Sequence, residues 1–299
     1  MSESIGAEPV DEGAVEIGER VVRWTAWGDP YGPSVLCQPG LGVPGTRLTR
    51  AEVDAIRGAG VELVIVARPG LGGSTPYPHR TIESDADDTI GVADALGLDR
   101  FDIVAHSVGT AVGLTVAARS ERVRRVVLIS PMAPVHSGDA DAYIGRRMRE
   151  LRMWFRFAPV ARWWIREAVK DVRRDPADAV RRSIRNMPEI DVVPASDPDA
   201  MAVGALDLAE LFADGAVALA EYRMMMAQWP IDLSTIRTPV TIWHGDLDRI
   251  STIAMGRWLS RRLVGARLEI LQGVGHYLTQ DINRRIFEDV RLSSSGEEI

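Results

Sequence analysis

One strand-to-helix corner constrains the fold of this chain more than any other stretch. Residues 101–105 favour a short buried strand, and the small and apolar residues 109–118 favour a closely packed helix. Ser107 lies between them, at a corner that holds a side chain outward at the carboxyl edge of a sheet. The small neighbours Ala105 and Gly109 let the backbone turn sharply. The corner therefore has the geometry that a nucleophile needs, with a simple helix-capping serine as the alternative.

Strand and helix patterns alternate on both sides of this corner. An alternating stretch at 14–27 predicts an antiparallel opening pair. Further strands are expected at 35–37, 61–67, 123–130, 240–243 and 267–271, and helices at 81–96, 253–263 and 278–290. Such alternation is typical of an α/β protein with a mostly parallel central sheet.

Residues 133–236 interrupt the alternation. This segment is rich in Arg, Ala, Met and Trp, contains several prolines, and favours helices throughout. We interpret it as a helical cap inserted into a sheet domain formed by residues 14–132 and 237–292. The polar stretch 1–13 is expected to be a mobile tail, and 293–299 a loose one.

An acid and a histidine follow two later strands. Asp246 and Asp248 come directly after the strand at 240–243, and His276 follows the last strand. The carboxyl ends of parallel strands meet at one edge of a sheet, so these side chains are expected to lie near Ser107. A serine needs an imidazole as base, held in turn by a carboxylate. The three loops therefore predict nucleophilic catalysis.

Two motifs resemble those of the α/β-hydrolase family. Ala-His-Ser-Val-Gly at 105–109 is one residue away from the family's Gly-x-Ser-x-Gly, and Arg-Pro-Gly-Leu-Gly-Gly-Ser at 68–74 resembles its Arg-Pro-Gly-x-Gly-x-Ser loop. The resemblance covers all but the tails and the cap. It implies a serine nucleophile at Ser107 with His276 as base. The family's Gly-x-x-Asp spacing selects Asp248 as the acid, which leaves Asp246 to bond loop amides.

The resemblance also implies an oxyanion hole. Its backbone donors would be the amides of Val108 and Leu41, although Pro39-Gly40 stands where the family usually has His-Gly. The same loop has a second interpretation, because Gly40, Gly42 and Gly45 match a dinucleotide-binding Gly-x-Gly-x-x-Gly. Against it, the next strand ends in Arg68 rather than an acid, and Pro44 removes an amide. We therefore expect no dinucleotide cofactor, and because the histidines do not have metal-ligand spacing, we expect no metal.

The cap is the expected source of substrate selectivity. Six residues are candidates for lining an apolar pocket over Ser107: His106, Met153, Trp154, Trp163, Met225 and Trp229. The alternative is that these side chains form the core of the cap itself. Residues 146–185 carry thirteen basic and five acidic residues. They predict either a solvated face or a site for an anionic carrier or carboxylate handle.

Composition restricts the remaining possibilities. The net charge of −7 argues against a general nucleic-acid binder, and the single cysteine excludes an internal disulfide framework. The N-terminus has no signal-peptide pattern, and no apolar run reaches membrane-spanning length, so we expect a cytoplasmic protein without membrane insertion. The prediction is a serine-dependent hydrolase that cleaves an ester, lactone or thioester of a bulky apolar small molecule through an acyl-enzyme intermediate. A cyclase, lyase, acyltransferase, carbon–carbon bond hydrolase or ligand-binding protein with a retained triad remains open, as does the oligomeric state.

Overall fold

A computed structural model describes residues 6–294 and is built around one eight-stranded sheet. The strand order is β1-β2-β4-β3-β5-β6-β7-β8. The strands are β1 (Asp11–Ile17), β2 (Arg20–Gly28), β3 (Ser34–Gln38), β4 (Glu62–Val66), β5 (Phe101–His106), β6 (Val123–Ile129), β7 (Val240–Gly245) and β8 (Arg267–Leu271). β2 is antiparallel to both of its neighbours, β1 and β4. All neighbouring pairs from β4 to β8 in this strand order are parallel. The predicted α/β class with a mostly parallel sheet is confirmed.

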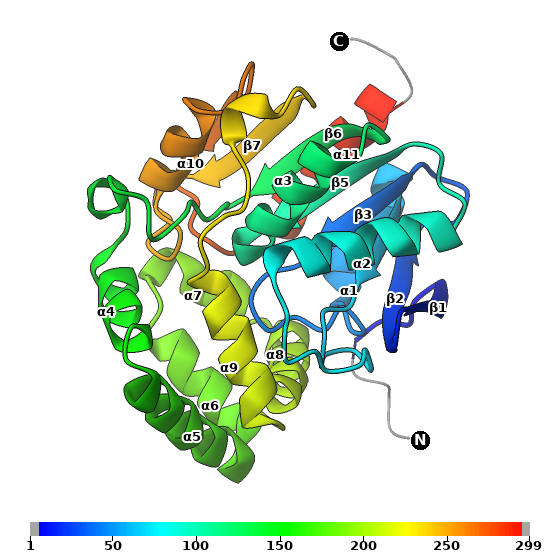
Figure 1. Ribbon diagram of the computed structural model, residues 1–299. Helices are drawn as coiled ribbons and strands as arrows, with labels where there is room; N and C mark the ends of the chain where they lie inside the picture. The colour runs from blue at the N-terminus through cyan, green and yellow to red at the C-terminus, as the bar shows by residue number, and fades with distance from the viewer. Residues whose placement is uncertain (1–5, 295–299) are drawn as a thin grey trace.

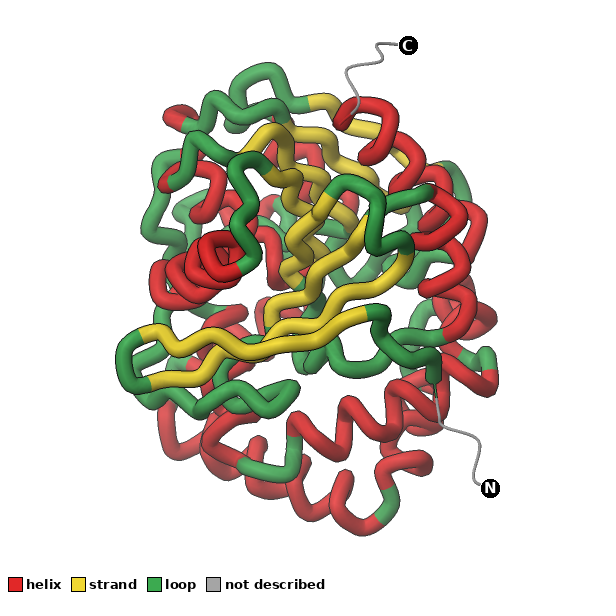
Figure 2. The backbone as a smooth tube through the Cα atoms, turned by 90° about the vertical axis from the view of Figure 1, so that its right-hand side faces the viewer, coloured by secondary structure: helices red, strands yellow, loops and turns green. Residues whose placement is uncertain are grey.

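Helices cover both faces of the sheet (Figures 1 and 2). One face carries α1 (Arg50–Ala59) and α11 (Gln280–Ser294), and the other carries α2 (Ile82–Ala95), α3 (Thr110–Arg119) and α10 (Ile253–Ser260). Side chains of a strand alternate between the two cores, so Ile103 of β5 packs on the α2 and α3 side and Val104 on the α1 and α11 side. Double coverage explains why the central strands are apolar without alternation.

Capping residues define the start and the end of α2, the helix that precedes β5. Thr81 accepts a hydrogen bond from the Ser84 amide, and the Ser84 side chain accepts one from the Thr81 amide. This reciprocal pair satisfies two amides at the start of α2. Gly97 follows the helix with a φ of 64°, a conformation that glycine adopts without a steric penalty.

The segment between β6 and β7 is mostly helical. Its helices are α4 (Arg146–Phe155), α5 (Ala158–Arg174), α6 (Pro176–Arg185), α7 (Glu189–Ala195), α8 (Pro198–Leu211) and α9 (Gly215–Met225). We call residues 133–236 the helical insertion. It lies against the loops after the parallel strands, and its own apolar core includes Ile165, Phe212 and Val217 with Leu71 from the sheet domain.

Helix does not extend through the whole insertion as predicted. Residues 133–145 form turns and one short 3-10 helix, Ala140–Ala142. Pro134 has no amide to donate to a helix, and the Ser137 hydroxyl donates to Asp139 in a local turn. Because these residues favour turns over helical hydrogen bonds, residues 133–145 do not form the predicted helix.

The ends of the described chain also differ from the prediction. β1 begins at Asp11, so residues 11–13 pair with β2 instead of belonging to a tail. Acidic residues are tolerated there because β1 is an edge strand with exposed side chains. Residues 6–10 form no helix or strand, although the amides of Ala7 and Val10 donate to the carbonyls of Leu48 and Ala26. Residues 293–294 complete α11, and the remaining parts of the predicted tails, 1–5 and 295–299, lie outside the described residues. Within 6–294, no helix is long and apolar enough to cross a membrane.

Candidate active site

Ser107 occupies a strained corner directly after β5. It begins a 3-10 turn, Ser107–Gly109, that leads into α3, and its φ of 52° lies in the left-handed region. Such a conformation costs free energy for a non-glycine residue and persists only where the surrounding structure imposes it. Gly109 is required for the close approach to β3, because a Cβ there would lie 2.2 Å from the Gln38 carbonyl oxygen. The corner therefore has the geometry expected of a nucleophile elbow.

Asp248 and His276 meet near His106, the residue before Ser107, whose ring centroid lies 5.2 Å from that of His276. The Nδ1 atom of His276 lies 2.8 Å from Oδ2 of Asp248, and both side chains are buried. The other carboxylate oxygen, Oδ1, accepts hydrogen bonds from the amides of Ile250 (2.8 Å) and Ser251 (2.9 Å). The acid is thus held on both oxygens, and one of them orients the imidazole.

The carboxylate of Asp248 is stabilised in its charged form. Burial is the largest influence and acts to raise its pKa, but hydrogen bonds from His244 and His276 lower the pKa of Asp248 to about 2. His244 was not identified as a site residue from the sequence. Its Nε2 lies 2.7 Å from the Ser251 carbonyl oxygen and 3.4 Å from Asp248 Oδ2. Both imidazoles therefore face the same carboxylate oxygen, Oδ2.

Asp246 lies in the same loop but makes a different contact. Its Oδ1 accepts a hydrogen bond from the Gly273 amide at 2.7 Å, which joins the loop after β7 to the loop after β8. The structure therefore brings Asp248 to the histidine and leaves Asp246 to bond a turn.

The two predicted oxyanion donors come from neighbouring loops. Val108 is in the turn after β5, and Leu41 is in the loop after β3. Among residues 6–294, no acceptor is found for the Leu41 amide, whereas the adjacent Gly42 amide donates to Glu221. The Leu41 amide is thus available to a bound ligand.

His106 lies between these loops. Its ring centroid is 5.2 Å from that of His276, and a Cβ on Gly40 would lie 2.8 Å from its Nδ1. Burial and the nearby His276 lower the pKa of His106 to about 3. A neutral imidazole therefore packs directly against residues 39–42 of the loop after β3, which we call the oxyanion loop.

A carboxylate from the helical insertion also reaches the histidine loop. Asp191 of α7 is fully buried, and its Oδ1 accepts hydrogen bonds from the amides of His276 (2.6 Å) and Tyr277 (2.9 Å). Burial is the main cause of its raised pKa, to which the charge of Asp248 contributes. Nothing in the local sequence distinguishes Asp191 from an ordinary helix-start acid, so it escaped prediction.

The other five predicted pocket residues differ in their surroundings. Met153, Trp154 and Trp163 expose 56%, 38% and 55% of their surfaces, whereas Met225 and Trp229 are half-buried against the main core. A cavity of about 780 Å³ opens beside α4, lined by His136, Asp141, Arg146, Arg149, Glu150, Arg152, Met153 and Arg156. Of the six candidates, only Met153 lines it. Within 6–294, no three His, Cys, Asp or Glu side chains are grouped as metal ligands would be.

Comparison with known proteins defines the class. Residues 35–288 match the alpha/beta hydrolase family, and the chain belongs to this family. The predicted family is thereby confirmed, and so is the prediction that the chain is a hydrolase enzyme.

Individual relatives are distant. A pimeloyl-(acyl-carrier protein) methyl ester esterase of Aromatoleum aromaticum is 26% identical over 221 residues, which cover 73% of this chain and 81% of that protein. A bromoperoxidase from Bacillus anthracis has a TM-score of 0.72 at 16% identity, covering 96% of this chain and 100% of that chain. An enol-lactonase from Burkholderia xenovorans has a TM-score of 0.65 at 18% identity, covering 95% and 99%. The likeness to the two solved structures shows the fold alone.

Proposed function

We propose that this chain is a serine hydrolase that cleaves an ester, lactone or thioester of a bulky apolar small molecule through an acyl-enzyme intermediate. The observation that carries the proposal is the 2.8 Å contact between His276 Nδ1 and Asp248 Oδ2, at the same sheet edge as Ser107 with its φ of 52°. Nucleophile, base and orienting acid are the three parts that acyl transfer needs.

In the proposed mechanism, Ser107 Oγ attacks the carbonyl carbon and its proton passes to Nε2 of His276. The negative charge on the carbonyl oxygen is stabilised by the amides of Leu41 and Val108. The bond to the leaving group breaks as His276 returns the proton to it. Water then attacks the acyl-enzyme with His276 as base, which releases the acid and restores Ser107. Asp248 keeps Nδ1 protonated, so that Nε2 is the free acceptor.

The preferred substrate is proposed to have a bulky apolar portion. Aromatic and methionine side chains are concentrated in the helical insertion, and Met225 and Trp229 pack against the main core. Each methylene buried in the transition state is worth about 0.8 kcal/mol. Lengthening the acyl chain of a p-nitrophenyl ester from two to six carbons is therefore expected to raise kcat/KM stepwise, measured by release of p-nitrophenol.

The same panel, extended to lactones and thioesters, discriminates between the possible activities. A flat chain-length profile would contradict the apolar pocket while leaving the mechanism intact. Tight binding without turnover of any compound would favour a ligand-binding protein. A product that joins the acyl group to an acceptor other than water would favour an acyltransferase or cyclase.

A second feature, the arginine-lined cavity beside α4, is proposed to receive an anionic handle. Arg146, Arg149, Arg152 and Arg156 line it together with the acids Asp141 and Glu150. Asp141 already pairs with Arg152 at 2.5 Å, and Arg146 lies 3.9 Å from Glu150. The name of the Aromatoleum relative specifies an acyl group on a carrier protein. By analogy, a phosphopantetheine-linked or carboxylate-bearing acyl ester is the proposed substrate.

Ionic strength tests this handle. Salt screens exposed charge pairs, so KM for a carboxylate-bearing ester is expected to rise several-fold between roughly 0.05 M and 0.5 M salt. KM for a neutral ester of the same length is expected to stay constant, which controls for general salt effects. An equal salt response of both esters would show that the arginines form only a solvated face.

A further inference from the structure

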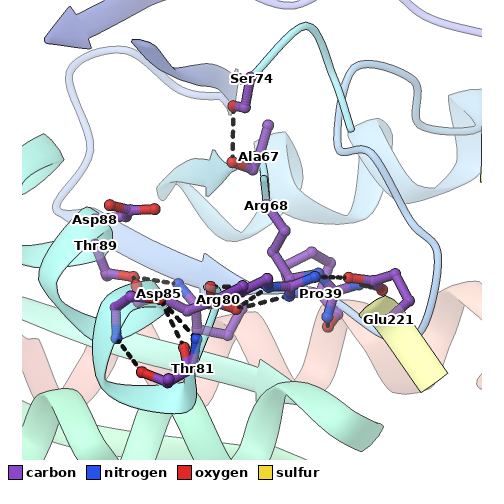
Figure 3. A network of polar contacts seen from close by, with 12 residues as sticks. Pro39, Ala67, Arg68, Ser74, Arg80, Thr81, Asp85, Asp88, Thr89 and Glu221 are labelled. Carbon is purple, nitrogen blue, oxygen red and sulfur yellow. Dashed lines mark hydrogen bonds and ion pairs between the residues drawn. The ribbon is translucent and has the colours of Figure 1, made fainter. Parts of the chain in front are cut away.

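We infer that Arg68 and Glu221 are positioning residues that aim the Leu41 amide at the reacting carbonyl, so that the helical insertion completes the oxyanion hole. The inference rests on the function proposed above for the same site. Figure 3 shows Arg68 reaching from the end of β4 toward Pro39 and Glu221, with Arg80 and Asp85 beside them.

Arg68 holds the peptide group that carries the Leu41 amide. Its guanidinium donates to the carbonyl oxygens of Pro39, at 3.3 Å, and of Gly40. The Gly40 carbonyl and the Leu41 N–H belong to one planar trans peptide, in which they point in opposite directions. A guanidinium fixed to the carbonyl therefore fixes the direction of the N–H. It also polarises the peptide and makes that N–H a stronger donor.

Glu221 holds the next peptide group. Its Oε2 accepts the Gly42 amide at 3.0 Å and lies 2.9 Å from an Arg68 nitrogen. The peptides on both sides of Leu41 are thus bound to one buried ion pair. Gly42 has a φ of 70°, and a Cβ there would lie 2.5 Å from a Leu211 methyl carbon, so this turn is also closed in by α8.

The charges of this cluster are balanced. Arg80 pairs with Asp85 at 2.7 Å and also contacts Glu221, which gives two cations and two carboxylates, all nearly inaccessible to solvent. Burial is the largest influence on the pKa of Glu221 and acts to raise it, but Arg68 and Arg80 bring the pKa below its ordinary value. The carboxylate therefore stays charged and keeps both arginines in place.

The contact spans two distant parts of the chain. Glu221 comes from α9 of the helical insertion, 179 residues from Gly42 in the sheet domain. Among the residues described, 6–294, no other carboxylate bonds both the Gly42 amide and Arg68. The oxyanion loop consequently has its catalytic shape only while α9 is docked, which makes the insertion part of the reaction machinery.

Glu221→Gln in the full chain tests the inference, with Asp85→Asn as the matched control. Each variant removes one carboxylate charge from the same cluster, but Asp85 contacts Arg80 and not the loop at 39–42. A displaced oxyanion donor weakens only the transition state, so Glu221→Gln is expected to lower kcat about 10- to 100-fold with KM nearly constant. Asp85→Asn is expected to retain kcat within about threefold of wild type.

Affinity for an oxyanion-forming inhibitor separates a positioning role from a merely structural one, because a merely structural role would not change this affinity selectively. A trifluoromethyl ketone matched to the best ester is expected to lose affinity in Glu221→Gln by the same factor as kcat/KM. The corresponding methylene analogue, which forms no oxyanion, is expected to bind equally to both proteins. Should Glu221→Gln fail to fold, Arg68→Lys provides a second test. Lysine retains the charge but lacks the planar guanidinium that binds a carbonyl and Glu221 together, so the same losses of kcat and inhibitor affinity are expected.

Three results would overturn the inference: wild-type kcat in folded Glu221→Gln, equal losses in Glu221→Gln and Asp85→Asn, or unchanged inhibitor affinity in Arg68→Lys. Failure of the proposed function is distinct from these. It would appear in the wild-type protein, as absence of ester turnover and of covalent modification at Ser107.

Discussion

Ser107→Ala is expected to lower kcat/KM for an activated ester by about 10⁴-fold or more, because it removes the hydroxyl on which the proposed acyl-enzyme forms. His276→Ala is expected to cause a similar loss, since an unassisted serine hydroxyl is a poor nucleophile at neutral pH. The two residues act as one unit, so the double variant should be little worse than either single one. Initial rates with a p-nitrophenyl ester measure all three.

Folding controls separate chemistry from stability in this series. Each variant should retain the wild-type circular dichroism spectrum, and Ser120→Ala, at the opposite end of α3, should retain wild-type kcat/KM. Substantial ester turnover by folded Ser107→Ala would show that the reaction does not pass through this hydroxyl.

Asp248→Asn is expected to lower kcat by about 10⁴-fold, whereas Asp246→Asn should cost less than about tenfold. An amide at position 248 can donate to Nδ1 of His276, which moves the imidazole proton to Nε2 and removes the acceptor for the serine proton. Its carbonyl can still accept the amides of Ile250 and Ser251. The loop should therefore remain folded, and the loss should appear in kcat.

Asp246 is a close control for Asp248. It lies two residues away in the same loop and bonds the Gly273 amide, a contact that the carbonyl of asparagine can retain. A larger loss at Asp246 than at Asp248 would reassign the acid without changing the nucleophile. Equal, small losses would show that the imidazole needs no carboxylate partner here.

Much of the sheet domain and the placement of the three site residues followed from local sequence. Ser107, Asp248 and His276 each stand just after a strand, and parallel strands deliver their carboxyl ends to one edge. Short motifs around Ser107 and at Arg68 were sufficient for the family. The apolar strands between them were recognisable because both faces of the sheet are covered.

Contacts made by the helical insertion were not predictable in the same way. Glu221 is the single acid of a mostly apolar helix, and nothing in that local pattern indicates its partners Arg68 and Gly42, which are more than 150 residues away. Asp191 reaches the His276 amide across 85 residues of the chain. Neither contact has a local signal, since each depends on how the insertion docks. Tryptophan and methionine content indicated a pocket but could not distinguish Trp163, which is exposed, from Trp164, which packs in the insertion core.

Intact-mass spectrometry after treatment with a fluorophosphonate tests the central claim most directly. Such a reagent modifies a serine only when a neighbouring base and an oxyanion site activate it, so it reports the whole arrangement and does not require the natural substrate. The account predicts one adduct per wild-type chain, mapped to Ser107 by peptide sequencing, and none in folded Ser107→Ala or His276→Ala. An unmodified wild-type chain, or an adduct of equal yield in folded Ser107→Ala, would contradict it.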